Sequence, residues 1–175
     1  MYKLINIKKI NKHDDGYSVH NYYKFLDYAF EKSDFFMLVY VNYYGKGYSK
    51  KQKYYKEKLM PYKVKSRSNP SWPGTPYTFS KDSTYKIVFY KAEKCAKQII
   101  MEAEAINDWT RPEMPEDIAF FVGNKCWFLS VGHENIATIV DPDKNDIDFL
   151  TENGFAQRGD ILFVNNDISS LTESF

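Results

Sequence analysis

The sequence Asp117-Ile-Ala-Phe-Phe-Val-Gly-Asn-Lys-Cys-Trp-Phe-Leu-Ser-Val-Gly-His-Glu-Asn-Ile-Ala-Thr-Ile-Val-Asp141 decides the fold of this chain. It contains three apolar segments of strand length, separated by two polar turns. Gly123-Asn124 favours a two-residue hairpin because both residue types tolerate positive φ. The stretch therefore predicts a three-stranded meander at about 118–140. Its expected core residues are Ile118, Phe120, Trp127, Phe128, Val131, Ile136 and Val140.

The composition predicts a chain with a substantial sheet. At 175 residues it is long enough to bury a sizeable core, and we expect residues 1–175 to form a single globular domain. Aromatic residues make up 18% of the chain, with 15 Tyr and 13 Phe. Tyr and Phe favour strands and bury large areas, so much of the core is expected to lie on strands.

Periodic patterns on both sides of the meander predict the remaining elements. Ser18 can cap a helix that ends near Ser33, and a second helix is expected from Ala92 to Asp108. Strands are expected at 2–10, 35–44, 62–65, 84–90 and 161–164, with 35–44 in the interior of the sheet and 62–65 at its edge. Shorter helices are expected at 49–60 and 141–152. The predicted fold class is α+β, a mostly antiparallel sheet with two main helices packed against it.

The chain lacks the sequence features of membrane and secreted proteins. No apolar run approaches the roughly 18 residues of a membrane-spanning helix, and the N-terminal residues do not resemble a signal peptide. Cys95 and Cys126 have no neighbouring ligand pattern, and Cys126 lies within an apolar strand. We therefore expect a cytoplasmic protein with no membrane association, disulfide, metal or cofactor.

Charge is divided unevenly along the chain. Residues 1–91 contain 18 Lys or Arg and 7 Asp or Glu, whereas residues 92–175 contain 6 and 16, so the halves carry +11 and −10. Such asymmetry favours partners of opposite charge, although two halves of one fold can also neutralise each other. Only three of the 24 basic residues are Arg. Lysine enrichment of this kind also accompanies an AT-rich genome.

The stretch from Lys46 to Arg67 is the strongest indication of a polyanion partner. It holds nine basic residues, one acid (Glu57) and interspersed tyrosines. Proteins that bind single-stranded nucleic acid use lysines to contact phosphates and aromatic residues such as tyrosine to stack on bases. The alternative is a solvated helix followed by an edge strand, in which Lys discourages pairing with other chains.

The connection at 66–83 is the candidate functional loop. It combines three prolines with Trp72, Thr75 and Tyr77, and long loops in compact proteins are often functional. We expect Lys65, Arg67, Trp72, Thr75 and Tyr77 to contribute to binding of a partner or ligand. The alternative is a loop whose Trp72 fills its own core.

His133 and Glu134 form the remaining candidate site. A histidine beside a carboxylate can act as a general base, and both residues follow a predicted strand. Ser130 does not lie in the Gly-x-Ser-x-Gly pattern of a nucleophile elbow. We include His133 and Glu134 among the binding residues and assign no catalytic residue.

Asp141 to Glu152 matches part of a calcium-binding loop. Oxygen-bearing side chains stand at positions 1, 3 and 5, with Glu at position 12, as in an EF-hand. Position 6 is Asp146 instead of glycine, and a strand-like run precedes the loop. We favour the alternative, a capped helix whose acids face its positive end.

Together these patterns favour a small non-enzymatic protein that binds another protein. An immunity- or antitoxin-like inhibitor is one concrete form, in which the acidic half occludes a basic active site. The first alternative is nucleic-acid or polyanion binding through residues 46–67. The second is a hydrolase or transferase that uses His133 and Glu134.

Overall fold

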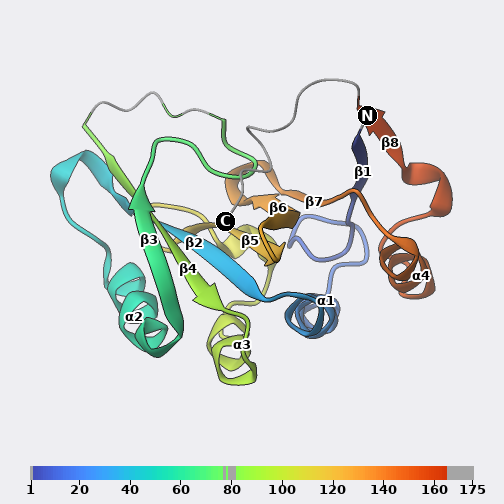
Figure 1. The fold of residues 1–175 in the computed structure, drawn as a ribbon, viewed down its shortest axis with the longest axis horizontal. Coiled ribbons are helices and arrows are strands. Elements are labelled where there is room, and N and C mark those ends of the chain that lie inside the picture. Colours follow the sequence, from blue (N-terminus) through green and yellow to red (C-terminus); the bar gives the residue numbers. More distant parts are fainter. Residues whose placement is uncertain (1, 77, 79–81, 165–175) are drawn as a thin grey trace.

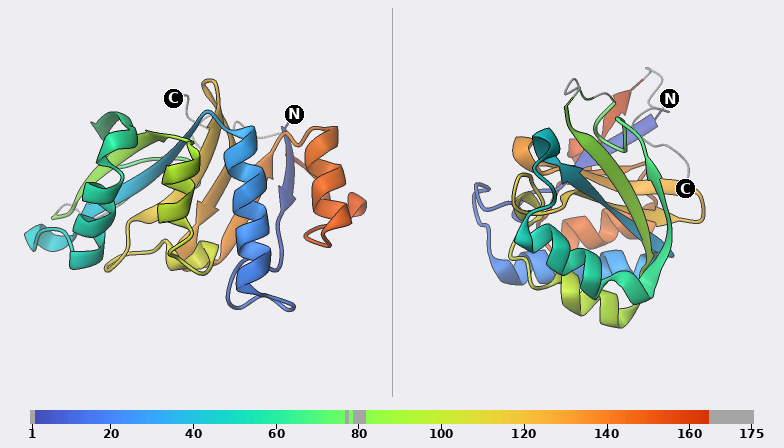
Figure 2. Two further views of the ribbon diagram at one scale, coloured as in Figure 1. Left: turned by 90° about the horizontal axis from the view of Figure 1, so that it is seen from below. Right: turned by 90° about the vertical axis from the view of Figure 1, so that its left-hand side faces the viewer.

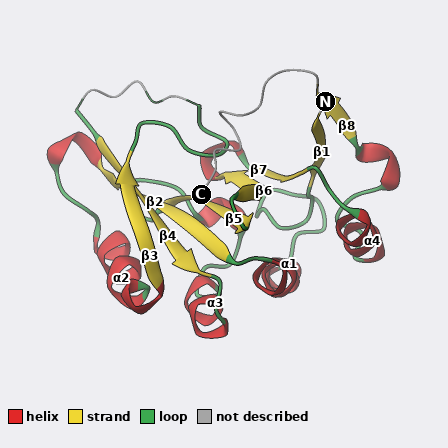
Figure 3. Ribbon diagram, viewed as in Figure 1, coloured by secondary structure: helices red, strands yellow, loops and turns green. Residues whose placement is uncertain are grey.

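The computed structural model describes residues 2–76, 78 and 82–164. Within these residues the chain forms an eight-stranded sheet in the order β3-β4-β2-β5-β6-β7-β1-β8, and every neighbouring pair is antiparallel. Four α-helices of the described chain lie along one face of the sheet, and loops lie over the other (Figures 1 and 3). The mixed α+β class with an antiparallel sheet is confirmed.

The described chain contains eight strands and four α-helices. The strands are β1 (Tyr2–Asn6), β2 (Phe35–Asn42), β3 (Lys63–Ser68), β4 (Thr84–Lys91), β5 (Glu116–Val122), β6 (Lys125–Val131), β7 (Ile136–Val140) and β8 (Leu162–Val164). The helices are α1 (Val19–Lys32), α2 (Lys50–Lys58), α3 (Lys94–Ile100) and α4 (Lys144–Glu152).

The meander predicted from the sequence is formed by β5, β6 and β7. Gly123 and Asn124 make the two-residue turn, with φ +53° at Gly123 alone. Asn135 ends the second turn in the left-handed region at φ +57°. Ile136 was expected in the core but is 36% exposed, because it begins β7 directly after that turn.

The cap predicted at Ser18 is present, and a serine also caps the second helix. The Ser18 side chain accepts a hydrogen bond from the Asn21 backbone N–H, and Ser49 accepts one from Gln52. The Gln52 side chain is buried and bonds to both backbone groups of Val41, which attaches α2 to β2. Such caps satisfy backbone donors that a helix cannot pair internally.

The prediction of two main helices, with one from Ala92 to Asp108, was wrong. The helix in this range, α3, ends at Ile100, and both α2 and α4 are longer than α3. The Asp108 carboxylate accepts backbone hydrogen bonds from Glu104 and Ala105, which starts a separate 3₁₀ turn. The chain therefore changes direction within the predicted helix. Cys95 on α3 is exposed.

Both faces of the sheet are buried, but by different means. Figure 2 shows all four helices on one face, where α1 packs Phe25 and Phe30 against Phe120 and Phe128. Alternate strand residues point to the opposite face. There a second apolar cluster includes Phe89, Phe121 and Leu129, and Trp72 reaches it from the loop after β3.

The lysine-rich helix α2 and the acidic helix α4 lie far apart along the sheet. Figure 1 shows α2 and β3 at one end of the sheet and α4 toward the other. Lys32 on α1 contacts Asp143 and Asp146 at the start of α4, at 2.9 and 2.6 Å. None of the described helices is long and apolar enough to cross a membrane.

Candidate functional site

A tight turn from Trp72 to Thr75 lies on the helix-free face of the sheet. The two residues exchange backbone hydrogen bonds of 3.0 and 2.8 Å across Pro73 and Gly74. Gly74 has φ +86°, and Pro followed by a residue with positive φ is typical of a type II turn. A Cβ on Gly74 would lie 2.9 Å from Val131 Cγ2, so the turn sits directly on β6.

Asp117 binds this turn to the sheet. Its Oδ2 accepts hydrogen bonds from Trp72 Nε1 at 2.8 Å and from Thr75 Oγ1 at 3.3 Å. Its Oδ1 accepts one from the Gly132 backbone N–H at 2.8 Å. Asp117 is fully buried, so these donors replace the water that its carboxylate has lost.

A β-bulge places Glu116 on the same face as Asp117. Met37 pairs with Ala119 and Val39 pairs with Glu116, so two residues of β5 lie opposite one residue of β2. The extra residue is Asp117, which has φ +50°. Directly opposed strand residues share a face, and Val39 belongs to the helix-free cluster. Consecutive carboxylates are therefore directed to one side of the sheet.

Glu116 is buried without hydrogen-bond donors from the described residues. It is 1% exposed, and its Oε2 has no hydrogen-bond partner there. Arg111 NH1 lies 3.6 Å from Oε2, and His133 Nδ1 lies 3.7 Å from Oε1. Because buried polar groups are nearly always paired, this carboxylate needs an explanation.

Burial changes the proton affinity of both acids. Desolvation and the adjacent Asp117 carboxylate raise the pKa of Glu116 to about 7, against the opposing effect of Arg111. Desolvation also raises the pKa of Asp117, and its hydrogen bonds to Gly132 and Trp72 oppose that change. Glu116 therefore exchanges its proton near neutral pH.

His133 connects this cluster to the solvent. Its side chain is 47% exposed, and its Nε2 lies 3.6 Å from Glu134 Oε1 on the outer side. The preceding Gly132 allows the turn to approach Trp109 closely, since a Cβ there would lie 2.2 Å from the Trp109 carbonyl oxygen. The cluster of Glu116, Asp117 and His133 is therefore buried on two sides and accessible at the imidazole.

The structure brings together only some of the residues predicted as binding residues. Trp72, Thr75 and His133 meet around Asp117, and Glu134 flanks His133. Trp72 is 1% exposed, so its ring fills a core, as the alternative interpretation of this loop expected. Lys65 and Arg67 lie over the Phe89 ring on β4. Tyr77 lies outside the described residues.

The basic stretch 46–67 is divided between the two faces of the sheet. Its α2 part lies on the helix-covered face, whereas Lys65 and Arg67 contact the helix-free cluster. Lys56 lies over the Tyr48 ring and Lys58 over the Tyr54 ring. These rings are therefore partly covered by cations from the same helix.

Asp141 to Glu152 forms the capped helix that was favoured over a calcium loop. Asp143 and Asp146 make a reciprocal capping box at the start of α4. Residues 144–152 are helical, so their side chains cannot surround one ion as those of an EF-hand loop do.

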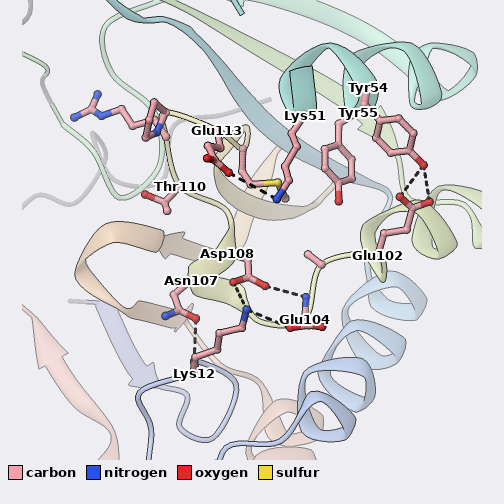
Figure 4. A pocket seen from close by; sticks show the side chains of 14 residues that line it. Lys12, Lys51, Tyr54, Tyr55, Glu102, Glu104, Asn107, Asp108, Thr110 and Glu113 are labelled. Carbon is pink, nitrogen blue, oxygen red and sulfur yellow. Dashed lines mark hydrogen bonds and ion pairs between the residues drawn. The ribbon is translucent and has the colours of Figure 1, made fainter. Parts of the chain in front are cut away.

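A second candidate site is a cleft of about 750 Å³ between α2 and the segment 102–114. Figure 4 shows Lys51 and Glu113 on one side and Lys12 with Asp108 and Glu104 on the other. The ion pairs span 2.7 Å for Lys12–Asp108, 3.3 Å for Lys12–Glu104 and 3.8 Å for Lys51–Glu113. The lining also includes the buried apolar side chains of Tyr55, Ala103 and Met114.

No protein family, curated protein or solved structure matches this chain. Its functional residues must therefore be judged from geometry. The sequence indicated His133 and Glu134 but missed Arg111, Glu116 and Asp117. Two acids directly before an apolar strand were a weak signal, because their common orientation depends on a bulge that no sequence pattern reveals.

Proposed function

We propose that this chain is a partner-binding protein that docks another protein in the cleft between α2 and residues 102–114. The observation that carries this proposal is the combination of an apolar floor and a charged rim in that cleft. Protein interfaces commonly have a buried apolar centre surrounded by polar groups.

The charges of the rim support a basic segment as the docked element. Four carboxylates and three cations line the cleft, which leaves a formal charge of −1. Glu104 and Glu113 are the most open of the paired acids, with side chains 66% and 75% exposed. A lysine or arginine from the partner would compete for these carboxylates while its stem covers the floor.

An immunity- or antitoxin-like inhibitor is the specific form that we favour. An inhibitor of this kind acts by covering a basic active site, and the acidic residues of 102–113 provide a complementary surface. Polyanion binding by residues 46–67 is the second candidate, favoured by the exposed lysines of α2. It is weakened by the division of that stretch between two faces.

The test compares the wild-type chain with two doubly substituted variants as baits in native lysate. Glu104→Gln with Glu113→Gln removes two charges from the cleft. Glu31→Gln with Glu152→Gln removes two exposed charges elsewhere, on α1 and α4. We expect wild type and the second variant to retain one protein stoichiometrically, and the cleft variant to lose at least about tenfold in affinity, or 1.4 kcal/mol.

Two results would contradict the proposal. Retention of RNA without a stoichiometric protein would favour the polyanion function. Equal retention of the same protein by both variants would show that binding does not use the cleft.

A further inference from the structure

We propose that Glu116, Asp117 and His133 form a binding site for a divalent transition-metal ion of the zinc class. One ligand atom from each of the three side chains lies within 4.8 Å of the others. None of the three residues lines the cleft of the proposed function, and the site is built on β5 and the turn after β6.

The distances fit an ion of this size after a small side-chain adjustment. Zinc binds carboxylate oxygen and imidazole nitrogen at about 2.0–2.2 Å, so two ligand atoms can be at most about 4.4 Å apart. Glu116 Oε1 and His133 Nδ1 are 3.7 Å apart, within that limit. The half-exposed imidazole has room to rotate, whereas both acids are fixed by burial.

The unpaired Glu116 carboxylate points independently to a ligand. It is almost fully buried, accepts no hydrogen bond from the described residues and faces the imidazole with Oε1. The oxygen without a hydrogen-bond partner among the described residues is Oε2, and Arg111 NH1 lies 3.6 Å from it, beyond hydrogen-bond distance. A bound cation would provide this buried carboxylate with the partner that it lacks.

The surrounding groups orient the three ligands. Trp72 and Thr75 both donate to Asp117 Oδ2 and the Gly132 N–H donates to Oδ1, so Oδ1 keeps a second lone pair for the ion. Glu134 lies 3.6 Å from His133 Nε2, on the side away from Glu116. A carboxylate behind a coordinating imidazole is the usual arrangement in zinc sites, because it fixes the ring and the tautomer.

The ligand set favours a transition metal over calcium. Imidazole nitrogen suits zinc and its neighbours, whereas calcium requires six to eight oxygens. Three protein ligands also leave a coordination position for water, as in zinc sites that are not purely structural. The site therefore accepts one ion with an open position toward the exposed side of His133.

The test is titration of the untagged chain with ZnCl₂ in metal-free buffer, followed by calorimetry and by thermal melting. We expect one ion per chain and a higher melting temperature, since the ion binds only the folded state. His133→Asn and Glu116→Gln should each weaken binding at least ~10-fold. His20→Asn is the matched control, because His20 is exposed on α1 outside the cluster, and it should bind as wild type does.

Far-UV circular dichroism must show that each variant is folded. Absence of stoichiometric zinc in the wild type would overturn the proposal. Equal affinities of wild type and His133→Asn would also overturn it, as would calcium binding that is as tight as zinc binding.

Discussion

The helix-covered face of the sheet is buried under four helices, whereas the opposite face near β5 and β6 is covered by the Trp72–Thr75 turn. The first face is dominated by aromatic rings that pack on one another. The second contains a buried pair of adjacent carboxylates. The comparison shows that extensive helix packing supplies most of the apolar burial, while the smaller cover holds the adjacent pair of carboxylates.

The largest effect is expected from loss of an aromatic ring on the helix-covered face. Phe120 is fully buried and contacts Phe25, Phe30 and Phe36. Phe120→Ala should lower the free energy of unfolding by about 3–5 kcal/mol, measured by urea denaturation. Phe163→Ala is the control, since Phe163 is 63% exposed and its loss should change stability by no more than about 0.5 kcal/mol. Similar losses for both variants would contradict this view of the core.

The next effect is a pH dependence that arises on the helix-free face. The pKa of Glu116 is raised from 4.5 to about 7, so the folded state holds this proton more tightly than the unfolded state. Its contribution is full below pH 4.5 and is lost as the pH rises to about 7, a change of about 3 kcal/mol. Denaturation of wild type and Glu116→Gln across this range measures it. The variant should lack this component, and parallel curves would refute the assignment.

One substitution can be made on both faces. Trp72 Nε1 donates to the Asp117 carboxylate, whereas Trp127 Nε1 donates to the Ser33 hydroxyl on the helix-covered face. Trp→Phe should cost about 2 kcal/mol at position 72 and about 1 kcal/mol at position 127, because hydrogen bonds to charged groups are stronger. Thermal unfolding of both variants measures the difference. The reverse order would show that the acceptor charge does not control these two bonds.

The smallest effect concerns the start of α1. Ser18→Ala removes the side-chain acceptor for the Asn21 N–H, at 3.1 Å, and should cost about 1 kcal/mol in urea denaturation. Ser18→Asp retains an acceptor and should remain close to wild type. If both variants lost the same stability, the effect would not come from capping.

The sequence predicted the helix-covered face better than its opposite. Apolar periodicity and the cap at Ser18 depend on neighbouring residues, so α1 and the meander could be identified locally. The end of α3 at Ile100 could not be identified in this way, because it depends on contacts of the irregular segment that follows. The site was least predictable, since Asp117 meets Trp72 across 45 positions of sequence. The sequence indicated His133 only through its residue type and its position in a predicted turn.

The bulge at Asp117 also has a consequence for how this site can arise in evolution. Glu116 lies opposite Val39 and Ala119 opposite Met37, so the residues on both sides of the bulge keep the alternation of a regular strand. Asp117 behaves as a single inserted residue that leaves the meander in register. One codon can therefore add or remove the carboxylate that holds the Trp72 turn, while the rest of the sheet keeps its pairing.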